Sequence, residues 1–250
     1  MYSMAAPHAK GKSAEDNIFA ANNRAIALAE KIGTENVVNA TVGSILDEDG
    51  SLVVLDVVKE ALSALTPKEI CAYAPIQGYR AFLDACIDQC FGKSRPEGYI
   101  DACSTPGGTG VLHHVVHNYS EVGDEVLISD WHWGAYDSLI DDNNRKVRTF
   151  SLLTEDGHFH VADFKEKVED ILSRQDNIVI ILNGIANNPT GYCLSDEEWQ
   201  AAIDVLKEAV KDETKKAILV PDVAYLDYSG EKEECRRFFR LFGGLPKNIL

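Results

Sequence analysis

The chain has 250 residues, of which 45% are hydrophobic and 26% are charged, as is ordinary for a globular protein. Its formal net charge of −16 at pH 7 argues against nucleic acid as a partner, because phosphate backbones are bound by basic surfaces. No uninterrupted run of about 18 apolar residues is present, so we expect no membrane span and no membrane partner.

Two helices are predicted in the first part of the chain, over residues 13–31 and 55–65. Ser13 is a typical N-cap for the first helix, and Gly33 follows its end. Thr66-Pro67 ends the second helix. Between them, a short apolar run leads into a turn at Gly43.

From residue 79 onward, predicted helices and strands alternate. Helices are expected over residues 79–91, 107–116, 133–140, 161–172, 195–210 and 233–242. Strands are expected over residues 99–103, 125–129, 146–150, 178–182 and 217–220, with another starting at 249–250. This order predicts an α/β fold, a mainly parallel sheet sandwiched by helices. In such sheets, ligands bind outside the carboxyl ends of the strands.

Distinctive segments follow four of these strands. They are Gly107-Gly108-Thr109-Gly110, Trp131-His132-Trp133-Gly134, Asn187-Asn188-Pro189-Thr190-Gly191 and Pro221-Asp222-Val223-Ala224-Tyr225. The glycine-rich segment opens a helix, whose free N–H groups and dipole favour a phosphate, and Thr109 adds a hydroxyl donor. Trp133 can stack on a planar ring. Asp222, at the end of a buried strand, needs a partner such as a protonated ring nitrogen.

Each segment alone also has an ordinary structural explanation. Glycines are common in turns, Trp133 is equally typical of a core aromatic, Asn188 lies in a rigid turn, and a backbone cap would satisfy Asp222. His113 stands where a dinucleotide-binding pattern needs its third glycine. His113 and His117 share a helical face, but no third ligand is clearly placed, so no metal site is predicted.

In combination and in this order, the four segments resemble the class I/II aminotransferases, which depend on pyridoxal 5'-phosphate (PLP). The resemblance covers nearly the whole chain from about Ile18, and N-P-T-G followed by D-x-A-Y is its most specific part. It implies the large domain of the PLP-dependent transferase fold type I. We assign this domain to residues 51–250, incomplete at its C-terminus, and residues 1–50 to an N-terminal arm and part of a small domain.

The resemblance implies cofactor-binding roles for the residues at the strand ends. Gly108 and Thr109 would hold the PLP phosphate, and Trp133 would stack on the ring and line the substrate pocket. Asp222 would keep the ring nitrogen protonated, because a nearby carboxylate favours the cationic form.

Four further residues gain roles in the same way. Asn188 and Tyr225 would contact the phenolic oxygen of the ring, and Asn188 would also lie near the substrate carboxylate. Tyr73 in Y-A-P-I-Q-G resembles a tyrosine that reaches the phosphate held by the neighbouring subunit, which implies a homodimer with shared active sites. Gly43 in N-A-T-V-G resembles a residue near the substrate carboxylate.

The chain also departs from the family's pattern. Gly107 stands where many relatives carry serine, and His113-His114 replaces a common arginine. The Schiff-base lysine is expected after one more strand, beyond Leu250, so no catalytic residue is assigned within the chain. Lys247, in a P-K-N turn before that strand, is not expected to replace it. The substrate-carboxylate arginine of the small domain is not found either.

The expected activity is PLP-dependent transfer of an amino group between an amino acid and a 2-oxo acid. One alternative is a different fold type I PLP enzyme, such as a β-eliminating enzyme or C–S lyase, because the scaffold alone does not select the reaction. The other is a non-catalytic PLP-fold binding or regulatory protein, if the natural chain ends at Leu250. Scattered cysteines without a C-x-x-C pair, and no apolar leader in residues 1–13, favour the cytoplasm.

Overall fold

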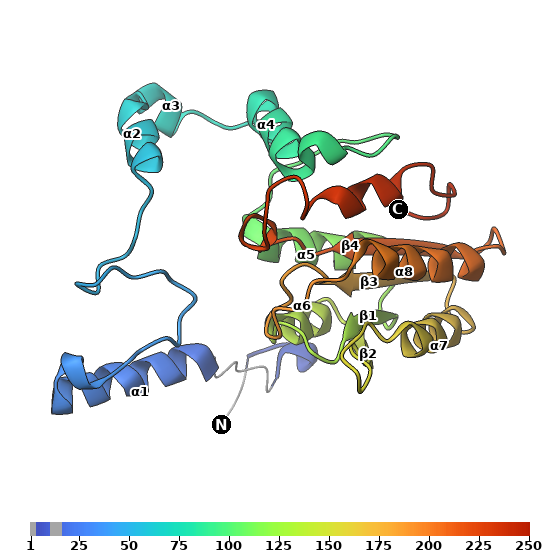
Figure 1. Ribbon diagram of the computed structural model, residues 1–250, viewed down its shortest axis with the longest axis horizontal. Coiled ribbons are helices and arrows are strands. Elements are labelled where there is room, and N and C mark those ends of the chain that lie inside the picture. The colour runs from blue at the N-terminus through green and yellow to red at the C-terminus, as the bar shows by residue number, and fades with distance from the viewer. Residues whose placement is uncertain (1–3, 11–16) are drawn as a thin grey trace. The chain divides into compact units, whose positions relative to one another are not determined.

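The structure is a computed structural model that describes residues 4–10 and 17–250 (Figure 1). The chain divides into two compact units, Met1–Tyr73 and Ala74–Leu250. The functional division that we predict at residues 50/51 stays a prediction. Ser13, the expected N-cap, lies outside the described residues.

The first unit contains both helices predicted from the sequence, and each is confirmed. Its elements are η1 (Pro7–Ala9), α1 (Asn17–Ile32), η2 (Thr34–Asn36), α2 (Asp56–Ala64) and α3 (Pro67–Cys71). Helix α1 ends at Gly33, whose amide donates to the carbonyl of Ala29. Helix α3 was not predicted. It begins at a capping box in which the Thr66 hydroxyl and the Glu69 carboxylate each satisfy the other's backbone amide.

The second unit carries a four-stranded parallel sheet, which confirms the predicted α/β fold. The strands are β1 (Glu125–Ser129), β2 (Lys146–Phe150), β3 (Asn177–Leu182) and β4 (Lys216–Pro221), in the order β2-β1-β3-β4. The helices are α4 (Arg80–Phe91), α5 (Gly107–Tyr119), α6 (Ala135–Asp142), α7 (Val161–Leu172) and α8 (Asp196–Ala209). Short 3-10 segments are η3 (Gly92–Ser94), η4 (Leu226–Tyr228) and η5 (Arg237–Phe242).

Strand β3 shows why an inner strand is almost entirely apolar. Ile178, Ile180 and Leu182 pack with α7 and α8 on one face of the sheet. Val179 and Ile181 pack with α5 and α6 on the other face. Because side chains alternate along a strand, helices on both faces bury residues 178–182 (Figure 1). The sheet therefore forms the middle layer of three, and its carboxyl edge is fixed by two hydrophobic cores.

Two sequence predictions are wrong. Residues 99–103 form no strand. Tyr99 is 92% exposed, and Asp101 is held by the Arg80 guanidinium at 3.0 Å instead of by a neighbouring strand. Residues 233–242 do not form an α-helix but end in the 3-10 segment η5, because tertiary packing of Phe238 and Phe239 overrides the local preference.

The predicted start of a strand at the end of the chain is confirmed. The Ala217 amide donates to the carbonyl of Asn248 at 3.0 Å, and the Leu250 amide donates to the carbonyl of Ala217 at 2.9 Å. Ile249 thereby bridges β4 in parallel. Within the described part of the chain, no helix is long and apolar enough to span a membrane.

Candidate functional site

A cavity of about 220 Å³ lies where β1, β3 and β4 end. Its walls come from the start of α5 and from the segments that follow these strands. It is lined by Gly108, Thr109, Leu112, Trp133, Tyr136, Asn183, Asn188, Asp222, Ala224 and Tyr225. The structure thus brings together the site residues predicted in the second unit. Gly43 and Tyr73 belong to the first unit, and their roles stay predictions.

The start of α5 offers free hydrogen-bond donors to this cavity. The first amides of a helix have no acceptor within the helix, and no other described residue accepts from the amides of Gly108 and Thr109. A Cβ placed on Gly108 would meet no atom within 4 Å, so the space beside these amides is open. Gly107 has a φ of 68°, a conformation that disfavours residues with a Cβ. This geometry suits an anion such as a phosphate.

Trp133 and Tyr136 form an aromatic pair on the wall. Their rings meet edge to face, with 5.8 Å between centroids and an interplanar angle of 83°. Tyr136 is only 2% exposed, whereas Trp133 is partly exposed to the cavity that it lines. A fixed indole on a cavity wall offers its face to a planar ring.

Asn183 joins the segments that follow β3 and β4. Its side-chain amide donates to the carbonyl of Asp222 at 2.9 Å, and its side-chain oxygen accepts from the amide of Asn188 at 2.6 Å. Asn183 is 3% exposed, so these two bonds are shielded from water. One buried side chain therefore sets the relative positions of two predicted site residues.

Asp222 is the only carboxylate on the cavity wall among the described residues. Its Oδ1 accepts from the amide of Ala224 at 3.0 Å, so the backbone cap considered from the sequence is present. Its Oδ2 accepts from the hydroxyl of Tyr136 at 2.5 Å. No lysine or arginine of the described chain lines the cavity, so the partners seen for this carboxylate are neutral. A cationic ligand group would complete its pairing.

Tyr136 is a cavity-lining residue that was not predicted from the sequence. Burial, followed by the neighbouring charge of Asp222, raises the pKa of the Tyr136 hydroxyl well above its usual range. The phenol therefore stays neutral and keeps its proton to donate. One signal was available in the sequence: Tyr136 lies three residues after Trp133, a spacing that places two side chains on one side of a helical turn.

Like the Thr109 hydroxyl, the Asn188 side-chain amide and the Tyr225 hydroxyl have no hydrogen-bond partner among the described residues. Both are available to a ligand. Lys247 lies elsewhere: its ammonium group contacts the carboxylate of Glu213 at 2.8 Å, and both side chains are exposed. This agrees with its assignment to a surface turn.

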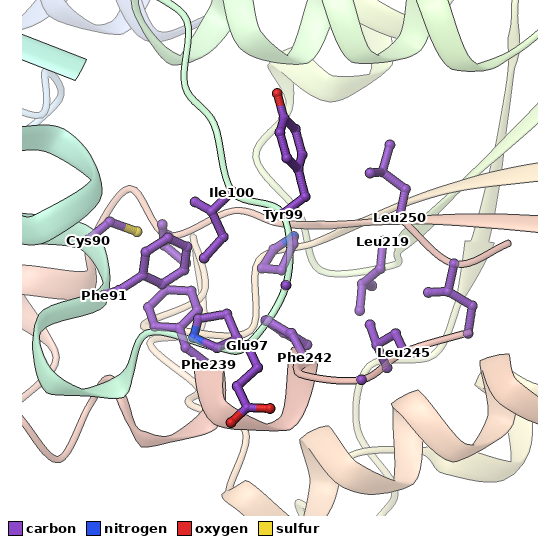
Figure 2. Close-up of a pocket in the computed structure, with 16 residues that line it drawn as sticks. Cys90, Phe91, Glu97, Tyr99, Ile100, Leu219, Phe239, Phe242, Leu245 and Leu250 are labelled. Carbon is purple, nitrogen blue, oxygen red and sulfur yellow. The ribbon is translucent and has the colours of Figure 1, made fainter. Parts of the chain in front are cut away.

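A larger cavity of about 670 Å³ lies beside η5 and the end of the chain. Apolar groups such as Phe91, Leu219 and Phe239 form most of its wall (Figure 2). Its one charged side chain is that of Glu97, and Figure 2 shows the Tyr99 hydroxyl pointing away from the apolar group. Because a specific small-molecule site needs several convergent polar groups, the smaller cavity is the better candidate.

Comparison with known proteins places the chain among the aminotransferases. The sequence profile for "Aminotransferase class I and II" matches residues 35–240. The chloroplastic aspartate aminotransferase of Arabidopsis thaliana is 31% identical over 82% of this chain and 45% of its own length. The aromatic-amino-acid aminotransferase of Pseudomonas aeruginosa is 27% identical over 84% of this chain and 52% of its own length.

Solved structures agree with this placement. The crystal structure of an aminotransferase from Anaerococcus prevotii superposes with a TM-score of 0.95 at 38% identity, covering 99% of this chain and 61% of that one. The chain spans about half the length of the curated relatives it matches. The profile match over most of the chain and the identity to these relatives show that the chain belongs to the class I and II aminotransferase family.

Proposed function

We propose that the cavity binds PLP and that the protein transfers an amino group between an amino acid and a 2-oxo acid. The observation that carries this proposal is the pairing of two features on one cavity wall. One is the set of free amides at the start of α5, and the other is the Asp222 carboxylate, whose observed partners are neutral donors. The first suits a phosphate and the second suits a protonated ring nitrogen. PLP, the cofactor of this family, carries both groups.

The other wall residues fit the same ligand. Trp133 would cover one face of the ring, while Asn188 and Tyr225 would donate to its phenolic oxygen with side chains that have no partner in the described chain. Gly108 and Thr109 would hold the phosphate. When bound, PLP supplies an electron-withdrawing ring that stabilises negative charge on the substrate α-carbon. The residues of the chain bind this ring, orient it and keep its nitrogen cationic.

Amino acid and 2-oxo acid substrates follow from the proposed activity, and the names of the relatives support it. The test uses the native protein isolated from the cell, incubated with PLP, L-amino acid donors and a 2-oxo acid acceptor. Amino transfer predicts that a new 2-oxo acid and a new amino acid appear in equal amounts, and only when the acceptor is present. Release of ammonia or pyruvate without an acceptor would show a lyase and contradict the proposal.

We also propose a homodimer in which Tyr73 reaches the phosphate site of the partner and Gly43 lies near the substrate. Tyr73 and Ile76 are both fully exposed, which leaves them available to a second copy of the chain. Sedimentation equilibrium should give twice the mass of the chain, and Tyr73→Phe should weaken PLP binding. A monomer that binds PLP with unchanged affinity would contradict this. A cytoplasmic location is proposed as well, supported by free cysteines that form no disulfide and testable by cell fractionation.

A further inference from the structure

Tyr136 lies on the wall of the cavity beside Asp222 and is almost fully buried. Tyr136 comes from α6, and its hydroxyl donates to Oδ2 of Asp222 across 86 residues of sequence. The donor–acceptor distance of 2.5 Å is typical of a hydrogen bond to an ionised acceptor. Only 2% of Tyr136 is exposed, so water does not compete for this bond.

The ring of Tyr136 is held in place from two sides. Trp133 meets it edge to face, and the His132 imidazole lies parallel to it with 6.2 Å between centroids. His132 itself has other partners, since its Nδ1 lies 2.8 Å from the carbonyl of Ser129 and its Nε2 lies 3.2 Å from Asp137. The His132 imidazole therefore packs against the Tyr136 ring, and the hydrogen bond to Asp222 comes from the Tyr136 hydroxyl.

The titratable surroundings of Asp222 are few. Tyr136 faces it from α6, and Tyr225 faces it from its own segment. Helix α5 contributes Gly108, Thr109 and Leu112 to the wall, none of which titrates. The side-chain hydrogen bond to Asp222 that comes from another element of the described chain is therefore that of Tyr136.

Resting on the proposed function, we propose that Tyr136 is a positioning residue that holds the Asp222 carboxylate aimed at the ring nitrogen of the bound cofactor. The Ala224 amide fixes Oδ1 and the Tyr136 hydroxyl fixes Oδ2, so the carboxylate cannot rotate freely. Because a hydrogen bond to a carboxylate is strong and directional, loss of the phenol would leave Oδ2 free to turn away from the ring nitrogen.

The experiment compares the unchanged chain with Tyr136→Phe, which removes only the hydroxyl and keeps the packed ring. The probe is pyridoxamine 5'-phosphate, which carries the same ring and phosphate and binds without forming a bond to a lysine. Its affinity is measured by calorimetry. We expect about tenfold weaker binding at neutral pH.

A matched control is Tyr192→Phe, which also removes a hydroxyl bonded to a carboxylate, that of Glu198 at 2.6 Å, but outside the cavity. It should leave the affinity unchanged. If Tyr136 acts through Asp222, then Tyr136→Phe should cause no further loss in an Asp222→Asn background.

Three outcomes would overturn the inference. Unchanged affinity in a folded Tyr136→Phe chain would show that the phenol only fills space. Independent, additive losses in the double variant would show that it does not act through Asp222. Failure of the unchanged chain to bind the probe at all would refute the proposed cofactor site as well, which separates that result from the other two.

Discussion

Replacing Asn183 with alanine should weaken both the fold and the candidate site. The side chain donates to the carbonyl of Asp222 and accepts from the amide of Asn188, and it is 3% exposed. Alanine leaves the carbonyl of Asp222 and the amide of Asn188, which form part-buried hydrogen bonds with Asn183, without partners. Among the described residues, no other side chain bonds to both segments, so the loss should appear at Asn188 and Asp222 together.

The magnitude follows from the two broken bonds. Leaving a buried backbone group unsatisfied costs about 1–3 kcal/mol, so two such groups give a loss of about 2–6 kcal/mol in the free energy of unfolding. For a unit of this size, each 1 kcal/mol lowers Tm by about 2–4 °C. A fall in Tm of about 4 °C or more is therefore expected, together with weaker binding of pyridoxamine 5'-phosphate.

The assay is thermal unfolding by circular dichroism, followed by calorimetric titration below the transition. Asn118→Ala is the matched control, because the Asn118 side chain donates to the carbonyl of His114 at an exposed position on α5. It should change stability by no more than about 0.5 kcal/mol. A chain with Asn183→Ala that unfolds at the same temperature and binds the probe equally well would refute the reasoning.

Three further variants test other parts of the structure. Asp222→Asn keeps the shape of the side chain but removes its charge, so calorimetry should show at least about tenfold weaker probe binding; equal affinity would exclude a charge-based contact. Trp199→Ala should lower the free energy of unfolding by about 3–5 kcal/mol in urea titrations. The reason is that the indole is fully buried and stacks on Phe238, with 4.9 Å between ring centroids. A smaller loss would mean that the core collapses around the gap. Desolvation raises the pKa of Glu198, but hydrogen bonds from Tyr192 and two backbone amides outweigh it and hold the pKa below its usual 4.5. Glu198 thus contributes stability that is present above pH 4.5 and is lost as the pH falls through its lower folded value. Tyr192→Phe should flatten this loss in unfolding curves recorded at acidic pH, and an unchanged slope would contradict it.

The strands of the central sheet could be predicted from the sequence because the residues that mark them are adjacent in the chain. Strands β1 and β2 have the predicted bounds, and β3 and β4 extend the predicted ranges by one or two residues. Continuous apolar runs bounded by turn residues suffice for such buried strands. The start of α8 is also set locally, by a Ser195–Glu198 capping box in which both hydrogen bonds are present.

Elements that depend on partners distant in sequence were harder to predict from the sequence. The run from Tyr99 to Cys103 has strand-like composition, but a strand needs the backbone of a neighbour, and none of the described strands pairs with it. Near the end of the chain, the guanidinium of Arg236 is buried and bonds to the carbonyls of Gln89 and Lys232 and to Asp227. The bond to Gln89, which lies 147 residues away in sequence, helps to fix a local conformation that helix propensity alone does not describe.

In the candidate site, too, some residues could be predicted from local motifs and others could not. Residues carried by motifs, such as Thr109, Asn188 and Asp222, could be named from the sequence because the topology places them at one sheet edge. Tyr136 and the bridging role of Asn183 could not, because their contacts cross between elements distant in sequence. Three-dimensional packing therefore adds the groups that orient the motif residues.

The most direct test of the cofactor site is a crystal structure of the chain soaked with pyridoxamine 5'-phosphate. The proposed site predicts density for the phosphate at the amides of Gly108 and Thr109, and density for the ring between Trp133 and the opposite wall. The ring nitrogen should lie within hydrogen-bond distance of Asp222. Density only in the larger apolar cavity, or a ring turned so that its nitrogen points away from Asp222, would contradict the account.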